Sequence, residues 1–339
     1  MATTDKKRKA QEDQERLRKA STAAHFKLSA KNAAAKEAQE DRWARERERM
    51  IEQGCYKPLS CVCEIDRVVL AVKELNIDSL RGIPGYRFQK KRYLGKKSRY
   101  RRAQPIKGTG SIKKIVVEYD RRSWAPAYRL TIEPTDTGLA PADLQSILEL
   151  LPDFKFSLIE VAWDFPGDSA VDVAYVRRFM LSGKLWLEPG THPYHFKCGN
   201  PKGSMIVKCY IKWELGGCRI ELQLQPRFVR QHRINDIFDF QRLVEVLVPG
   251  HIHFSELDQA KLVAQLQRRG FSDQRMQNVL DMTEDLGDSL WAALRYLRKK
   301  GLTNVQRLCT PLDGTNRVIR KALVKLLATW PKGPARLES

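Results

Sequence analysis

The stretch that most constrains the fold of this chain covers residues 208–224 and reads KCYIKWELGGCRIELQL. Polar and apolar residues alternate on both sides of the glycine pair Gly216-Gly217. Alternation with period two around a two-residue glycine turn predicts an antiparallel β-hairpin. With these glycines as the loop, Lys212 is expected to lie opposite Glu221. The polar face of the hairpin is expected to carry Lys208, Tyr210, Lys212, Arg219, Glu221 and Gln223.

A third strand is predicted at residues 157–164, SLIEVAWD, where Glu160 and Asp164 share one face. Two carboxylates separated by a small residue provide the oxygen ligands that Mg²⁺ or Mn²⁺ requires. Beside the hairpin, Glu160, Asp164 and Glu221 would form a metal site next to Tyr210. A tyrosine beside a metal can act as a nucleophile on a phosphoryl group. The alternative interpretation is a solvated sheet face that binds no metal.

Three segments of the chain carry a recognisable pattern: IEVAWDFPGD at 159–168, GTHPYHFKCGNPKGSMIVKCYIKWE at 190–214, and CRIELQL at 218–224. Together they resemble the replication initiation factor family, which includes Rep-trans type rolling-circle initiators of plasmids, phage replication proteins and some conjugative relaxases. The family pattern is roughly R-I-D-L-A-x-D, G-T-x-Y-x-G-S-x-x-S, R-x-Y-D-K and R-x-E-L. Its positions correspond here to Glu160, Asp164, Gly199, Ser204, Tyr210, Lys212, Arg219 and Glu221. Leu158 and Glu160 replace the family's Arg and Asp, and Ile211 stands where Asp is common.

This resemblance implies a metal-dependent DNA nicking-joining endonuclease that starts rolling-circle replication at an origin. Tyr210 would attack a phosphodiester, keep the 5′ phosphate and free a 3′-OH, while Lys212 and Arg219 stabilise charge on the phosphoryl oxygens. Tyr194 is the second candidate for the nucleophile, and His192 and His195 are placed to assist. The expected partners are single-stranded or cruciform origin DNA, duplex DNA, a host helicase and polymerase, and a second copy of the chain.

The charge of the chain also favours a nucleic-acid partner, since its formal net charge is +21. Residues 81–130 contain 16 Lys and Arg against 2 acidic residues. Cations that bind phosphates alternate there with aromatic rings that can stack on unpaired bases. The candidate DNA-binding residues are Arg87, Lys90, Lys91, Arg92, Tyr93, Lys96, Lys97, Arg99, Tyr100, Arg101 and Arg102. The alternative is a mobile basic loop without a ligand.

A second arrangement fits a different class of nicking enzyme. His251-Ile252-His253 matches a His-hydrophobe-His signature, and Tyr296 lies in a Y-x-x-K pattern that ends at Lys299. Two histidines on one strand face can bind a metal, and a tyrosine on a nearby helix can attack phosphate. A non-catalytic DNA- or RNA-binding protein is a further alternative, and a metal-dependent cleavage assay on single-stranded DNA distinguishes it from both enzymes.

The predicted fold class is α+β, with an antiparallel or mixed sheet and flanking helices. We expect a basic, partly helical or disordered arm at 1–53, a sheet-based nicking domain at 54–245 and a basic helical region at 246–339. Further strands are predicted at 64–72, 112–118 and 128–132. Helices are predicted at 141–150, 171–181, 255–269, 273–282, 287–300 and 314–329, with N-caps at Ser255 and Ser272 and ends at Gly270 and Gly301.

Two further features bear on the compartment of the protein. No run of about 20 apolar residues predicts a membrane span, and the first residues lack the apolar segment of a signal peptide. Seven cysteines, an odd number in a long chain, are typical of a reducing compartment. We therefore expect a cytoplasmic protein.

Overall fold

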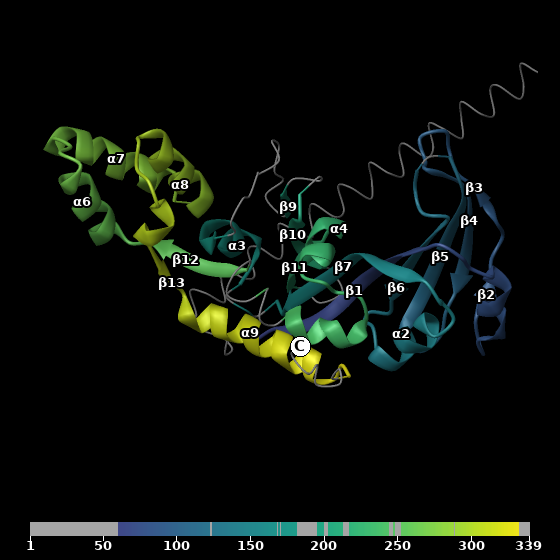
Figure 1. Ribbon diagram of the computed structural model, residues 1–339. Coiled ribbons are helices and arrows are strands. Elements are labelled where there is room, and N and C mark those ends of the chain that lie inside the picture. The colour runs from purple at the N-terminus through teal and green to yellow at the C-terminus, as the bar shows by residue number, and fades with distance from the viewer. Residues whose placement is uncertain are drawn as a thin grey trace, which may run out of the picture. The chain divides into compact units, whose positions relative to one another are not determined.

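The computed structural model describes residues 60–331, except 123, 168, 170, 182–194, 200–202, 213–216, 244–246, 248–251 and 288. The arm predicted at 1–53 lies outside these residues. The described residues belong to one compact unit and form a large antiparallel sheet with flanking helices (Figure 1). The predicted α+β fold class is therefore confirmed.

The main sheet has ten strands, and neighbours pair in the order β2-β4-β5-β6-β1-β7-β11-β10-β9, with β3 also paired to β4. Every described pair is antiparallel. The strands are β1 Val62–Val72, β2 Arg87–Phe88, β3 Arg92–Tyr93, β4 Tyr100–Lys107, β5 Ile112–Arg121, β6 Tyr128–Pro134, β7 Phe154–Phe165, β9 His195–Cys198, β10 Met205–Lys212 and β11 Gly217–Leu224. The strands predicted around residues 64–72, 112–118, 128–132 and 157–164 are all present.

One face of the central strands is apolar and is covered by the C-terminal helix α9, Asp313–Ala328 (Figure 1). Val161 and Trp163 of β7 are completely buried on this face, beside Ile220 of the neighbouring β11. The indole Nε1 of Trp163 donates a hydrogen bond of 3.2 Å to the Ile319 carbonyl in α9. The polar residues that alternate with these apolar ones must therefore lie on the opposite face of the sheet.

The hairpin predicted at residues 208–224 is present, but its predicted register is wrong. Lys212 pairs with Gly217 and not with Glu221, whose partner is Lys208. Gly217 is the first residue of β11 and lies very close to the backbone of β7. A Cβ at this position would lie 1.8 Å from the Phe165 carbonyl oxygen, so this close approach requires glycine. The partner of Glu221 therefore differs from the predicted one by four residues, Lys208 in place of Lys212. A register shift by an even number of residues keeps each side chain on its predicted face.

Short helices flank the sheet and begin for local reasons. α2, Pro141–Leu148, has proline at its first turn, where the missing N–H costs no hydrogen bond, and it buries Leu144, Ile147 and Leu148. α3, Val173–Phe179, is capped by the Asp172 carboxylate. The remaining short elements are α4 Pro226–Gln231 and the 3₁₀ helices η1 Ile77–Gly82 and η3 Ile237–Arg242.

The helix predicted at residues 255–269 begins later than expected, so the Ser255 N-cap was wrong. Residues His253–Leu257 form strand β12, which pairs with β8, Met180–Leu181, and with β13, Cys309–Pro311. Asp258 then accepts a hydrogen bond from the Lys261 backbone N–H at 3.0 Å, and helix α6 follows as Gln259–Arg268. Ser255 is not an N-cap because it pairs with Pro311 within the strand, and the first capping side chain after the strand is that of Asp258.

A small helical module lies between β12 and β13. It consists of α6, α7 Asp273–Asp285, α8 Leu290–Lys299 and η4 Val305–Leu308, and it has its own hydrophobic cluster. Gly270 and Gly301 follow α6 and α8 with φ of +69° and +87°, as predicted for helix ends. α9 instead packs with the sheet core, although it follows the module in sequence. No helix in the described ranges is long and apolar enough to cross a membrane.

Candidate active site

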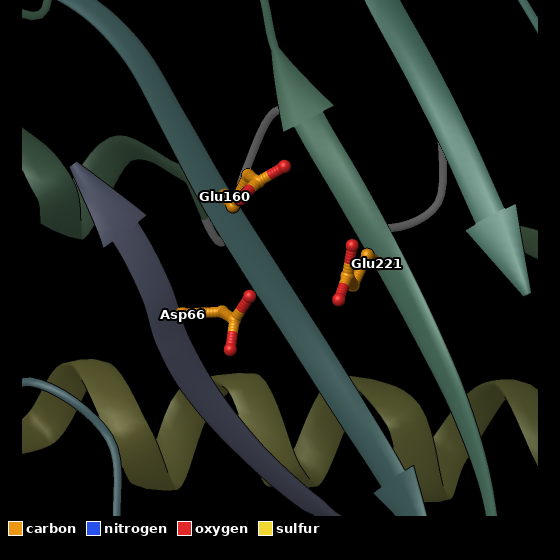
Figure 2. Close-up of side chains that lie close together, drawn as sticks. All are labelled: Asp66, Glu160 and Glu221. Carbon is orange, nitrogen blue, oxygen red and sulfur yellow. The ribbon is translucent and has the colours of Figure 1, made fainter. Parts of the chain in front are cut away.

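The polar face of β1, β7, β11 and β10 carries a dense network of charged side chains, and Figure 2 shows three of its carboxylates, Asp66, Glu160 and Glu221. A β-bulge in β1 is essential to it: Ile65 pairs with Val161 and Arg67 with Glu160, which leaves Asp66 as an extra residue. The bulge changes the phase of the strand, so that Ile65 and Val68 both point into the core. Asp66 can then turn its carboxylate toward the polar face, where Figure 2 shows it beside Glu160 and Glu221.

Arg219 of β11 is the most highly connected residue of this network. Its Nε and Nη2 donate to the two oxygens of Asp164 at 2.5 and 2.6 Å, and its Nη1 donates to Asp66 at 2.6 Å. Nη2 also donates to Glu64. Lys212 lies 3.1 Å from Asp164 and 3.8 Å from Glu64. Arg219 is only 3% exposed, so its guanidinium binds protein carboxylates rather than solvent.

A second group of side chains surrounds Glu160 and Glu221. The Lys208 ammonium bridges them, at 3.1 Å from Glu160 and 2.9 Å from Glu221. The Tyr210 hydroxyl donates a hydrogen bond to the other oxygen of Glu221. Glu160 also accepts from Gln223, while Arg67 lies 3.2 Å from its second oxygen without forming a well-aligned hydrogen bond.

Burial and neighbouring charges raise the pKa values of four groups in this network. Burial raises the pKa of Glu64 and of Asp66 above the ordinary range, although Arg219 opposes the shift. Burial also raises the pKa of the Tyr210 phenol, and the hydrogen bond to Glu221 and its charge add to the effect. The pKa of Lys208 is lowered by burial but raised more strongly by Glu160 and Glu221 together. At neutral pH, Tyr210 is therefore a neutral hydroxyl and Lys208 a cation.

Three of the carboxylates fit a divalent cation. Asp66, Glu160 and Glu221 each offer an oxygen, and these oxygens lie within 4.8 Å of one another. Glu160 Oε2 is buried and accepts no well-aligned hydrogen bond, although the Arg67 guanidinium lies 3.2 Å away, so this oxygen keeps a lone pair for a further cation. Oxygen ligands of this kind suit Mg²⁺ or Mn²⁺. Around them, five carboxylates face four basic side chains, so the network retains a formal charge of −1: Glu64, Asp66, Glu160, Asp164 and Glu221 against Arg67, Lys208, Lys212 and Arg219.

The structure brings most of the predicted site residues together. Tyr210, Lys212, Arg219, Glu160, Asp164 and Glu221 all lie on one sheet face, and His195 of β9 is opposite Tyr210. Asp164, predicted as a metal ligand, instead binds Arg219 and Lys212 through both oxygens. Arg219, predicted to meet phosphoryl oxygens, is enclosed by carboxylates.

Sequence reasoning missed Glu64 and Asp66, and it placed Lys208 on the polar face without a role. The change of phase in CEIDRVV, where the apolar positions switch from odd to even numbers, is the signal that could have found the bulge. Tyr194, His192 and His251 lie outside the described residues. Two residues of the candidate His-hydrophobe-His site are described. His253 is the first residue of β12, and Tyr296 lies in α8 with the Lys300 ammonium 5.2 Å from its ring centre. Burial lowers the pKa of His253.

In the basic stretch at residues 87–102, Arg87–Phe88, Arg92–Tyr93 and the start of β4 are strands at one edge of the sheet, and turns and loops join them. Both β2 and β3 pair with β4, so the stretch is held along that edge. All the candidate DNA-binding residues of this stretch are exposed except Tyr100, which is 3% exposed and donates a hydrogen bond to Pro126. Its ring is therefore not available to stack on a base. Tyr93, by contrast, is 83% exposed, with the Arg102 guanidinium 5.8 Å from its ring centre.

A pocket of about 430 Å³ lies between this edge and the charged network. Its lining includes Val69 and Leu158, each two residues along its strand from Arg67 and Glu160 and therefore on the same face. Arg99 lines the other side, with its guanidinium 5.2 Å from the ring centre of Trp124, which is 83% exposed. A partly apolar pocket with a cation and an exposed aromatic ring beside it thus adjoins the basic edge.

The chain was compared with known families, curated proteins and solved structures. No family model matches the chain, and no curated protein matches it. Among solved structures, it is similar to a rolling circle replication initiator protein from Geobacillus stearothermophilus, at 14% sequence identity and a TM-score of 0.38. The similarity covers 58% of this chain and 87% of that one. A TM-score of this size supports no conclusion, so the proposals below rest on the residues of this chain.

Replacing Arg219 should destabilise the fold in a pH-dependent way. Arg219→Gln leaves Asp164, Asp66 and Glu64 facing one another without their shared cation, which costs about 3–5 kcal/mol at neutral pH. A carboxyl group whose pKa is higher in the folded than in the unfolded protein favours folding most at pH values below its pKa in the unfolded chain. This contribution is lost as the pH rises through its pKa in the folded protein. The loss measured by denaturant unfolding should therefore be smaller at about pH 4 than at pH 7. Arg81→Gln, at an exposed position outside the network, is the control, and equal losses for Arg219→Gln at both pH values would contradict the network.

The basic edge should govern the salt dependence of nucleic-acid binding. Replacing Lys90, Lys91, Arg92, Lys96 and Lys97 with Gln should flatten the log–log salt dependence by about 0.7 per lost contact on single strands. Tyr93→Ala should instead cost about 1–3 kcal/mol on unpaired DNA and leave this slope unchanged, because stacking releases no counterions. Affinities measured across a salt series provide both values, and an unaltered slope would mean that the edge does not contact phosphates.

Proposed function

We propose that this protein is a DNA nicking-joining enzyme that uses Tyr210 as its nucleophile. The observation that carries the proposal is the hydrogen bond from the Tyr210 hydroxyl to Glu221, a member of the three carboxylates that fit a cation. A nucleophile held by a base, beside groups that balance phosphoryl charge, is the arrangement that phosphoryl transfer needs. The exposed cations of the basic edge support a polyanionic substrate.

In this proposal the Tyr210 oxygen attacks the phosphorus of a DNA phosphodiester. A bond forms between the phenolic oxygen and the phosphorus, and the bond from phosphorus to the 3′ oxygen breaks. The phenolic proton moves to Glu221, which is needed because the raised pKa keeps Tyr210 protonated at neutral pH. The leaving 3′ oxygen takes up a proton and becomes a 3′-OH, and the 5′ phosphate stays on Tyr210. The reverse reaction rejoins the strand.

The other residues of the face have distinct roles in this proposal. Lys208, at 27% side-chain exposure and beside Glu221, can meet a phosphoryl oxygen near Tyr210, whereas Arg219 and Lys212 are more deeply buried among carboxylates. Asp66, Glu160 and Glu221 would hold Mg²⁺ or Mn²⁺, which when bound polarises a phosphoryl oxygen. Asp164 serves to orient Arg219.

The wider role that we propose is initiation of rolling-circle replication, in which a polymerase extends the freed 3′-OH. This role rests on the resemblance of the Tyr210 and Glu160 segments to replication initiation factors. Origin DNA would be the substrate, and a host helicase and polymerase would act after the nick. A non-catalytic nucleic-acid-binding protein is the second candidate, favoured by one observation: Lys208 already bridges Glu160 and Glu221, the position where a metal would bind.

Tyr210→Phe should abolish the covalent protein–DNA adduct and leave DNA affinity within about twofold, because the ring and the basic edge are retained. The measurement is adduct formation on labelled single-stranded DNA with Mn²⁺, followed by mass spectrometry of the tyrosyl peptide. Tyr194→Phe and Tyr296→Phe are the matched controls and should keep the adduct. Loss of the adduct in only one of these controls would assign the nucleophile there, and absence of any adduct from the wild-type protein would favour the non-catalytic alternative.

Removing a carboxylate of the proposed metal site should abolish metal binding as well as nicking. Glu160→Gln and Asp66→Asn should each lower Mn²⁺ affinity at least tenfold in calorimetric titrations of the full chain, whereas Glu149→Gln, at the exposed residue that follows α2, should leave it unchanged. DNA affinity should not fall in either site variant, since removing negative charge does not weaken the attraction of phosphate. Full nicking by the wild-type protein in EDTA would rule out the metal.

A further inference from the structure

The helical module contains a basic pocket that the proposed nicking reaction does not use. The pocket has a volume of about 350 Å³ and lies between α6 and the segment that leads into η4. Residues 261, 265 and 268 are spaced at four and three positions along α6, so their side chains share one helical face. The polar residues that line the pocket are Lys261, Gln265, Arg268, Thr303, Asn304 and Arg307.

The lining of this α6 pocket is strongly positive. Of the described residues that line it, three are basic and none is acidic. Asp258, the nearest carboxylate in sequence, lies 3.0 Å from the Lys261 ammonium and compensates its charge. Lys261 also donates to Thr310 at 3.0 Å. The positive charges of Arg268 and Arg307 have no such partner among the described ion pairs.

Neighbouring residues hold the walls of the pocket in place. Arg269, next to Arg268, donates a hydrogen bond of 3.2 Å to the Thr303 hydroxyl, which ties α6 to the opposite wall. Asn304 has a left-handed backbone with φ of +53°, and its side chain makes no cap hydrogen bond to η4. Below the pocket, Leu262 and Leu266 of α6 pack with Val305 in the cluster of the module. The polar side chains therefore stand on a packed base.

We propose that the α6 pocket binds a phosphate group, held by Arg268 and Arg307. Guanidinium groups bind phosphate oxygens in pairs, and an amide and a hydroxyl beside them add further hydrogen bonds. The net charge of +21 makes a nucleic-acid backbone the leading source of this phosphate. Free phosphate or a small phosphorylated compound offers the same chemistry. The proposal does not depend on Tyr210 and stands if nicking is not found.

The test compares two double variants of the full chain that lose the same charge. Arg268→Gln with Arg307→Gln empties the pocket of guanidinium groups. Arg298→Gln with Lys299→Gln removes two exposed cations of α8, outside the pocket. Each protein is titrated with a DNA duplex of mixed sequence over a salt series and, separately, with inorganic phosphate. Thermal unfolding of the variants without ligand checks that the module remains folded.

If a backbone phosphate occupies the pocket, the pocket variant should bind duplex at least tenfold more weakly, with a salt slope lower by about 0.9 for one phosphate. The α8 variant should change less than threefold. If inorganic phosphate instead stabilises the wild-type protein and the α8 variant but not the pocket variant, the phosphate site holds and its ligand is small. Equal losses in both variants, or no effect of the pocket variant on either ligand, would overturn the proposal.

Discussion

The candidate site depends on one buried interaction, the guanidinium of Arg219 among the carboxylates of Asp164, Asp66 and Glu64. These acids come from β7 and β1, so a single side chain of β11 binds across three neighbouring strands. Buried ion pairs of this type contribute less to stability than to a unique arrangement, because desolvation offsets most of the attraction. Arg219 is the cross-strand partner of Tyr210 and lies two residues along β11 from Glu221, so the buried guanidinium anchors the strand that carries Glu221 beside the Tyr210 hydroxyl.

The sequence predicted the faces of this sheet better than its register. Period-two alternation assigns each residue to a face, and an even shift of register leaves that assignment unchanged, as Glu221 shows. Alternation does not determine the register in which two strands pair. Here the register depends on the close contact between Gly217 and the Phe165 carbonyl, two residues that are distant in sequence. For the same reason, Glu160 and Glu221 were found, while Asp66 was missed: it lies in a bulge, where the simple period fails.

Residue type alone also could not separate the aromatic residues of the basic edge. Tyr93 and Tyr100 occur in the same cationic stretch, yet one is exposed and the other is buried against Pro126. The difference arises from β4, which pairs on both sides and turns Tyr100 inward. Trp124 was not predicted as a binding residue, and its exposure beside Arg99 depends on the turn between β5 and β6. Composition thus identified the surface but not its individual contacts.

The position of the helical module has a consequence for how the protein can vary. Leu257 and Cys309 are paired neighbours, so the chain leaves the small sheet and returns to it at the same point. An inserted segment whose two ends are adjacent places almost no geometric constraint on the rest of the chain. The entropic cost of closing it grows only with the logarithm of its length. The module can therefore be exchanged for another of different size while α9 still reaches the main sheet, so a change of this single insert need not disturb the main sheet or the charged network on it.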